Sequence, residues 1–233
     1  MSIRAVAFDF FGTLTPAITA DTRRTHLAAI GAVLGRSADE VHREFRASFG
    51  ERVRGDLGDL PGTLRVIAER LGLDVTPEQL DEIVRLRYDG QVVTFSFRPD
   101  VPDTLWALHR RGLRTAVVSD CSVELPMIWP DLLIAPLVDA TVFSCVERTA
   151  KPDPRMFALA AERLQVRADQ VLYVGDGGGN ELPGAATTGM RPVLLCADDR
   201  DLDDSVGRRD DWAGERIGTI GGVLELVDAG PVL

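Results

Sequence analysis

The fold prediction rests on one stretch near the start of the chain, Ile3–Thr15, which reads IRAVAFDFFGTLT. Residues 3–8 form a compact, mainly apolar run, which is typical of a strand buried on both faces of a parallel sheet. Asp9 follows this run directly, so its carboxylate would lie at the carboxyl end of the strand, where open α/β sheets bind ligands. Gly12 then permits a tight turn. The stretch therefore predicts a first strand and a candidate catalytic acid.

Four later runs are short, apolar and rich in Val and Leu, as buried strands are. They are Arg114–Val118, Ala140–Phe143, Val171–Val174 and Pro192–Leu195. Helical patterns lie between or beside them, at Pro102–Arg111, Pro154–Leu164 and Glu181–Gly189. Alternation of this kind indicates the α/β class, with an open parallel sheet and helices on both faces.

One long segment, Pro16–Arg98, departs from the alternation and is mainly helical. Its helix candidates are Arg23–Leu34, Ala38–Phe49, Gly62–Leu71 and Pro77–Tyr88. An insertion after the first strand lies over the crevice where such sheets bind ligands. We therefore predict a catalytic core of residues 1–15 and 99–233 and an α-helical cap of residues 16–98.

Composition excludes several classes of protein. The 233 residues carry 26 Lys+Arg and 36 Asp+Glu, a net charge of −10, and 45% are hydrophobic. This hydrophobic share is too high for a disordered chain, and no run approaches the roughly 18 consecutive apolar residues of a membrane span. The negative charge disfavours nucleic acid as a partner but allows a small anionic substrate in a locally positive pocket. It says nothing of the oligomeric state.

Two other features set expectations about the environment of the chain. Cys121, Cys145 and Cys196 have neither metal-ligand spacing nor a disulfide framework, so we expect reduced, mainly buried thiols. The apolar run at residues 3–8 is too short for the core of a signal peptide, so we expect a cytoplasmic protein. The charge-dense segment Asp198–Trp212 is typical of a solvated surface loop.

Four polar signals each fall at or shortly after the carboxyl end of a predicted strand. They are Asp9, Ser119-Asp120, Lys151 and the run Gly175–Glu181 (GDGGGNE). Each alone has an ordinary structural explanation, such as a helix cap or a turn. Their occurrence in this order, an acid, a hydroxyl, an ammonium and further acids, favours a catalytic site.

Together these motifs resemble those of the haloacid dehalogenase superfamily of hydrolases, over essentially the whole chain. The resemblance places the family's aspartyl nucleophile on Asp9, its hydroxyl on Ser119, its lysine on Lys151 and its acidic metal motif on Asp176 and Glu181. It implies a Rossmann-like parallel sheet with a mobile cap. Most members are magnesium-dependent phosphatases or phosphotransferases that form an aspartyl-phosphate, and a minority cleave carbon–halogen bonds without metal.

The resemblance also implies a ligand set for Mg²⁺. Asp9 and Asp176 would hold the ion, with the main-chain carbonyl of residue 11 as a further ligand, because Mg²⁺ prefers oxygen. Glu181 would orient metal-bound water or pair with Lys151. The Lys151 ammonium would spread positive charge over the nucleophile and the phosphoryl oxygens. The candidate substrate-binding residues are Phe10, Phe11, Ser119, Asp120 and Lys151.

Phe11 departs from the family pattern. Family phosphatases usually carry a second Asp at this position as general acid/base, and losing such a group costs about 10²–10⁴-fold in rate. An aromatic residue here resembles the metal-free dehalogenases, whereas Gly175-Asp176 resembles the metal-binding branch. Three hypotheses follow: a Mg²⁺-dependent phosphohydrolase of a small phosphorylated metabolite, a metal-free dehalogenase-like hydrolase, and a divergent member that binds a phosphorylated ligand without turnover.

The cap would select the substrate. Its candidate contacts are Arg23, Arg24, His26 and His42, which could equally belong to solvated helix faces.

Overall fold

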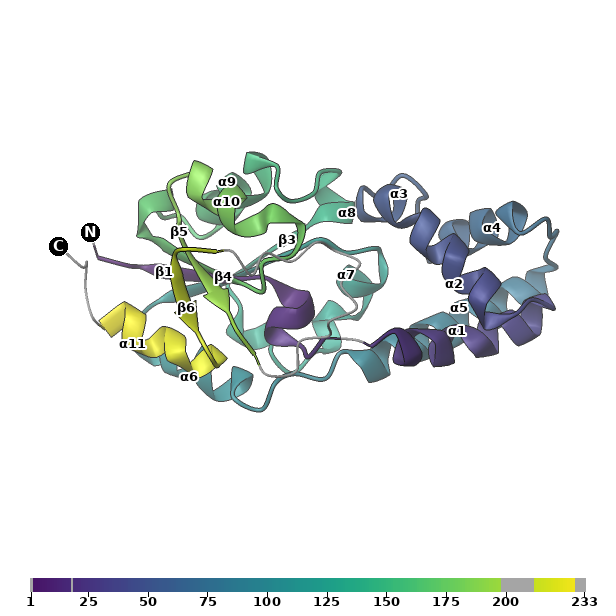
Figure 1. The fold of residues 1–233 in the computed structure, drawn as a ribbon, viewed down its shortest axis with the longest axis horizontal. Coiled ribbons are helices and arrows are strands. Elements are labelled where there is room, and N and C mark those ends of the chain that lie inside the picture. The colour runs from purple at the N-terminus through teal and green to yellow at the C-terminus, as the bar shows by residue number, and fades with distance from the viewer. Residues whose placement is uncertain (1, 18, 198–211, 229–233) are drawn as a thin grey trace.

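The core is built on one open parallel sheet, seen in a computed structural model that describes residues 2–17, 19–197 and 212–228 (Figure 1). Its strands are β1 (Ala5–Phe8), β2 (Arg114–Ser119), β3 (Ala140–Phe143), β4 (Val171–Gly175), β5 (Arg191–Leu195) and β6 (Glu215–Ile217). The order across the sheet is β3-β2-β1-β4-β5-β6, and every pairing is parallel. Phe8 pairs with Val117 of β2 and with Val174 of β4, so the residues after these strands meet at one edge. The predicted parallel sheet is confirmed, with β6 as an additional strand.

Helices cover both faces of the sheet (Figure 1). One face carries α6 (Val101–Arg110) and α11 (Val223–Asp228), and the other carries α9 (Pro154–Arg163) and α10 (Glu181–Thr187). Alternate residues of β1 enter different cores: Phe8 packs with α6 and α11, whereas Ala7 packs with α9 and α10. Because side chains alternate along a strand, an apolar run such as β1 is buried on both sides.

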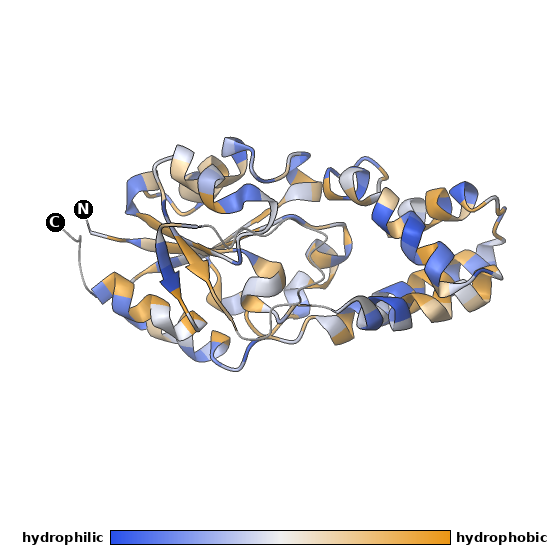
Figure 2. Cartoon of the chain, in the orientation of Figure 1, coloured by the Kyte–Doolittle hydropathy of each residue, from blue (hydrophilic) through white to orange (hydrophobic). Residues whose placement is uncertain are grey.

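Helices α1–α5, inserted after β1, form a cap at the end of the molecule far from both termini (Figure 1). Their bounds are α1 (Ala20–Leu34), α2 (Ala38–Ala47), α3 (Phe49–Val53), α4 (Leu60–Arg70) and α5 (Pro77–Thr94). Hydrophobic and hydrophilic residues stripe these helices (Figure 2). The inward stripes make a core of the cap's own, which includes Ile30, Val41, Leu64 and Ile83.

The connections between cap and core pass beside the β1 turn. Arg98, on the return from the cap, donates from its main chain to Leu14 O (3.0 Å). Its guanidinium donates to Thr13 O (2.8 Å) and Gly12 O (2.9 Å). One arginine therefore fastens the end of the cap insertion to the turn that follows Asp9.

The sequence patterns did not predict several short elements. They are α7 (Glu124–Ile128), α8 (Ser144–Glu147), a turn of helix at Phe10–Leu14, and 3₁₀ turns at Trp129–Asp131, Ala135–Leu137, Ala168–Gln170, Gly178–Asn180 and Ile220–Gly222. The predicted helix Ala38–Phe49 ends at Ala47. There the Ser48 hydroxyl donates back to Glu44 O (2.8 Å) and the chain turns into α3.

The structure also bears on the charge-dense segment, the cysteines and the membrane-span prediction. Residues 198–211 of the charge-dense segment Asp198–Trp212 lie outside the described residues. The three cysteines are free thiols, with Cys121 and Cys145 buried and Cys196 partly buried. Among the described residues, no helix is both long and apolar enough to cross a membrane.

Candidate active site

Asp9 stands where β1 gives way to a tight turn. Its main-chain N–H donates to Val174 O (2.9 Å), which carries the sheet pairing one residue past the strand. Phe11 is extended, and Gly12 has φ +79°, a left-handed value that favours glycine. The turn leaves Asp9 95% buried but lining a cavity at the carboxyl edge of the sheet.

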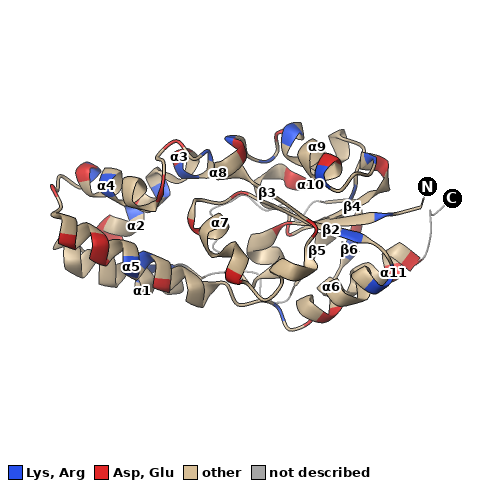
Figure 3. Cartoon of the chain, turned by 180° about the vertical axis from the view of Figure 1, so that it is seen from behind, with Lys and Arg blue, Asp and Glu red and all other residues tan. Residues whose placement is uncertain are grey.

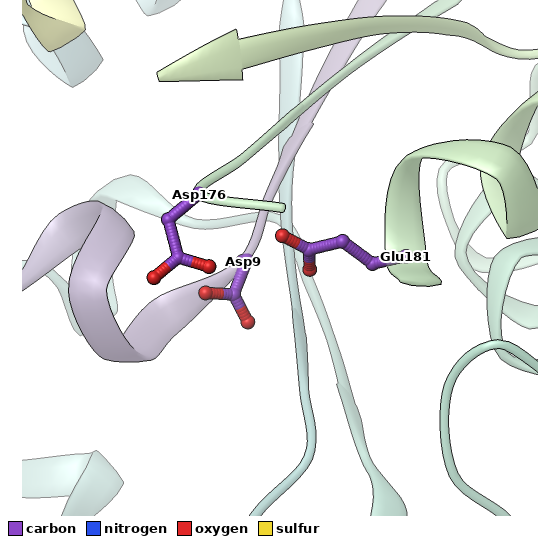
Figure 4. Close-up of side chains that lie close together, drawn as sticks. All are labelled: Asp9, Asp176 and Glu181. Carbon is purple, nitrogen blue, oxygen red and sulfur yellow. The ribbon is translucent and has the colours of Figure 1, made fainter. Parts of the chain in front are cut away.

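Two further acids come from the segment after β4. Asp176 follows the strand, Glu181 begins α10, and both point toward Asp9 (Figure 4). Carboxylate oxygens of the three residues all lie within 4.8 Å of one another. Gly175 is required here, because a Cβ at that position would lie 2.1 Å from Glu181 Oε1. The glycine before Asp176 thus makes room for the third carboxylate.

Lys151 joins two of these acids. Its ammonium donates to Asp9 Oδ1 (2.5 Å) and to Glu181 Oε2 (2.6 Å). The hydroxyl of Tyr173, inside β4, also donates to Glu181 Oε2 (2.7 Å), and the main-chain N–H of Gly177 donates to Oε1 (2.9 Å). Both oxygens of Glu181 are thereby engaged within the protein.

Burial and charge act in opposite directions on these groups. Burial by itself would lower the pKa of Lys151, but the adjacent Asp9 and Glu181 raise it well above its usual value. Burial raises the pKa of Glu181, helped by the nearby negative charges of Asp9 and Asp176 and opposed by Lys151. Lys151 is therefore a permanent cation at the centre of the acidic cluster.

The other predicted site residues take different positions. Ser119 ends β2 fully buried, and its hydroxyl makes no hydrogen bond with any described residue. Asp120 accepts from the main-chain N–H of Lys151 (2.9 Å) and so fixes that loop. Phe11 lines the cavity. Phe10 was predicted to bind substrate, but its ring is buried against Phe95 in the hydrophobic core and the residue does not line the cavity.

A cavity of about 390 Å³ lies between this cluster and the cap. From the core it is lined by Asp9, Phe11, Asp120, Lys151, Asp176 and Glu181, among others, and from the cap by Arg23, His26, His42, Arg46, Arg52 and Arg87, among others. The volume is at the lower end of the range for small-molecule sites, which favours a small metabolite.

The chain was compared with known proteins and structures. The family described as haloacid dehalogenase-like hydrolase matches residues 3–189. The chain belongs to this family. Similar proteins include a glyceraldehyde 3-phosphate phosphatase of Methanopyrus kandleri, 29% identical over 83% of this chain and 84% of that protein. A phosphoglycolate phosphatase of Salmonella paratyphi A is 30% identical over 83% and 81%. Among solved structures, a 2-haloacid dehalogenase from Pseudomonas syringae superposes with a TM-score of 0.71 at 22% identity, covering 97% and 99% of the two chains, which shows a shared fold.

The cap residues of this hydrolase partly match the prediction. Arg23, His26 and His42 line the cavity, whereas Arg24 does not and pairs with Asp21 (3.0 Å). The sequence reading missed the cavity-lining residues Phe45, Arg46, Phe49, Arg52, Arg87, Gln91 and Thr94. Spacings of three or four residues are the signal that marks one helix face, as in His42 and Arg46 on α2, Phe49 and Arg52 on α3, and Arg87, Gln91 and Thr94 on α5.

A buried ion network joins the cap of this hydrolase to its core. Arg87 of α5 donates to Glu124 Oε1 of α7 (2.7 Å), and Arg52 of α3 donates to Ser122 Oγ (3.1 Å). Ser122 in turn donates to Glu124 Oε2. Glu124 is 1% exposed, so the network holds the cap against the core through charges removed from water.

Proposed function

We propose that this hydrolase is a Mg²⁺-dependent phosphohydrolase that cleaves phosphomonoesters of a small metabolite through an aspartyl-phosphate on Asp9. The observation that carries the proposal is the convergence of Asp9, Asp176 and Glu181 within 4.8 Å, beside Lys151. Relatives that are phosphatases support it.

The donor set fits a hard divalent cation. The candidate ligands are carboxylate oxygens, which Mg²⁺ prefers. Glu181 is committed to Lys151, Tyr173 and Gly177, so Asp9 and Asp176 are the residues that would hold the ion directly. When bound, the ion would neutralise charge between a carboxylate nucleophile and a phosphate dianion.

Asp9 is arranged to act as the nucleophile. Oδ1 is held by the Lys151 ammonium, and Oδ2 accepts no hydrogen bond from any residue in the described part of the chain. An Asp9 oxygen attacks phosphorus, the bond to the leaving oxygen breaks, and an aspartyl-phosphate forms. Water then attacks this phosphorus, releasing phosphate and restoring the carboxylate. The Ser119 hydroxyl is buried and has no hydrogen-bond partner among the described residues, so the proposal assigns it as a donor to a phosphoryl oxygen.

Phe11 limits the esters that can react. Its ring lines the cavity at the position where family phosphatases carry an acid, and it can neither protonate a leaving alkoxide nor activate water. We infer a preference for leaving groups of low pKa, unless a cavity-lining histidine of the cap, His26 or His42, supplies the proton.

The test is phosphate release from p-nitrophenyl phosphate with Mg²⁺ and with EDTA. Turnover that requires Mg²⁺ and falls at least about 1,000-fold in Asp9→Asn is expected. Asp89→Asn, an exposed carboxylate of α5, is the matched control and should retain activity. Turnover in Asp9→Asn would refute the proposal.

Phe11 also supports a second candidate function, carbon–halogen cleavage with Asp9 as nucleophile. Chloride release from 2-chloropropionate, undiminished by EDTA, would favour it over phosphate transfer. Binding of Mg²⁺ and beryllofluoride with no turnover of either substrate would instead identify a ligand-binding member.

A further inference from the structure

The charged residues with which the described part of the cap lines the cavity are all basic. The cap residues lining the cavity include the basic residues Arg23, Arg46, Arg52 and Arg87, and the histidines His26 and His42, but no acid. The cap helices as a whole differ, because acidic and basic residues are interspersed along them (Figure 3). The positive wall is therefore a property of the cavity and not of the cap as a whole.

Arg52 and Arg87 have partners in the interface between cap and core. Arg87 is paired with Glu124 (2.7 Å). Arg52 donates to Ser122 Oγ (3.1 Å) and to Phe45 O (2.7 Å), and is 92% buried. Both guanidiniums are therefore engaged in the interface between cap and core, and we do not assign either of them to the ligand.

Arg46 differs from these two. It lies exposed on α2 and lines the cavity, and its guanidinium forms no ion pair or hydrogen bond with another described residue. His42, one helical turn earlier, also lines the cavity. Burial, together with the charges of Arg46 and Arg23, lowers the pKa of His42, which indicates an excess of positive charge at this end.

The opposite end of the same cavity holds the acidic cluster and Lys151. On the proposed function, the phosphoryl group of the substrate binds there. The remainder of the substrate would then occupy the rest of the cavity, of about 390 Å³ in all, and extend toward Arg46 and Arg23. A guanidinium recognises a carboxylate or a phosphate through paired hydrogen bonds.

We propose that the substrate is a phosphomonoester bearing a second anionic group, a carboxylate or another phosphate, which Arg46 and Arg23 of the cap bind. This inference rests on the proposed function. It adds the chemical class of the substrate and names Arg46 as a specificity-determining residue.

The test compares esters that differ in one group. 3-Phosphoglycerate and glycerol 3-phosphate share a skeleton and differ by a carboxylate in place of a hydroxymethyl group, and glycerol 1,3-bisphosphate carries a second phosphate instead. We expect kcat/KM for an acidic ester to exceed that for glycerol 3-phosphate by about 10- to 100-fold, mainly through KM. Whichever acidic ester is preferred identifies the second group.

Arg46→Gln should reduce this preference at least about 10-fold, because glutamine stays polar but loses the charge and the paired donors of the guanidinium. Arg43→Gln is the matched control, since Arg43 is exposed on the same helix and does not line the cavity. Equal kcat/KM for acidic and neutral esters, with p-nitrophenyl phosphate still hydrolysed, would overturn the inference and leave the proposed function intact.

Absence of turnover with every phosphate ester would refute the proposed function, and binding then tests the anion site separately. Thermal melting with 3-phosphoglycerate, the bisphosphate and glycerol 3-phosphate supplies the readout. Greater stabilisation by an acidic ester that disappears in Arg46→Gln supports the site. Equal stabilisation by all three esters, or none, overturns it.

Discussion

Glu124→Gln tests whether the buried network between cap and core stabilises the folded protein. Glu124 is 1% exposed and faces Arg87. Burial alone would raise its pKa, but the charge of Arg87 and the hydrogen bond from Ser122 outweigh it. With a further contribution from Arg52, they lower the pKa from 4.5 to about 2.

The size of the effect follows from this difference. A carboxyl whose pKa falls from 4.5 to about 2 on folding stabilises the folded state by roughly 3 kcal/mol at neutral pH. Because the folded pKa is the lower one, this stabilisation is complete above about pH 5 and is lost as the pH falls toward 2. Glutamine keeps the shape but leaves Arg87 and Arg52 without a buried counter-ion, a change that typically costs about 3–5 kcal/mol.

Urea unfolding at several pH values supplies the measurement. At pH 7 we expect Glu124→Gln to lose about 3–5 kcal/mol, a decrease in Tm of roughly 10 °C for a chain of this size. The difference in free energy of unfolding between Glu124→Gln and the wild type should decrease between pH 5 and pH 3. Glu82→Gln is the control, since the Glu82–Arg85 pair (2.6 Å) is exposed and should contribute less than about 1 kcal/mol. A decrease of less than 1 kcal/mol in the free energy of unfolding of Glu124→Gln, or a difference from the wild type that does not change with pH, would refute the reasoning.

Three further changes have defined outcomes. Lys151→Met should lower kcat for p-nitrophenyl phosphate by about 10²–10³-fold, because the charge beside Asp9 and Glu181 is lost; an unchanged kcat would contradict this. Phe11→Asp should raise the rate with glycerol 3-phosphate relative to p-nitrophenyl phosphate, and no change would mean that a missing acid is not limiting. Gly55→Ala should lower Tm, because its Cβ would lie 2.2 Å from a main-chain carbonyl of the core; an unaltered Tm would contradict the close packing of cap on core.

Much of the fold could be predicted because its strands are short apolar runs between well-marked helices. β1 illustrates this, since all four of its residues are fully buried. β6 was not predicted, because only Ile217 of its three residues is buried and the strand pairs with β5 alone. α7 and α8 have five and four residues, too few for a helical period to emerge.

The candidate site was predictable at the level of residues but not of contacts. Parallel strands end at one edge of a sheet, so residues that follow β1, β2 and β4 must lie near one another. The pattern could not show that Glu181 binds Lys151, nor that Tyr173, inside an apolar strand, donates its hydroxyl to the same carboxylate. Both facts depend on side-chain direction. Phe10 is the converse case, because its neighbours in sequence suggest a site residue while its ring fills the core.

The charge balance of the cavity explains why the two ends would serve different tasks. In the core, the Lys151 ammonium pairs with Asp9 and Glu181, Asp176 lies near both acids, and Asp120 adds a fourth acid to the lining. A phosphate dianion could not approach this cluster without further positive charge, and the cap cannot supply it there, because Arg52 and Arg87 are paired within the interface. On the proposed function, we therefore expect a divalent cation at the bond-breaking end. The unpaired charge of Arg46 is left for the remainder of the substrate, so changes in the core should act on kcat and changes at Arg46 on KM.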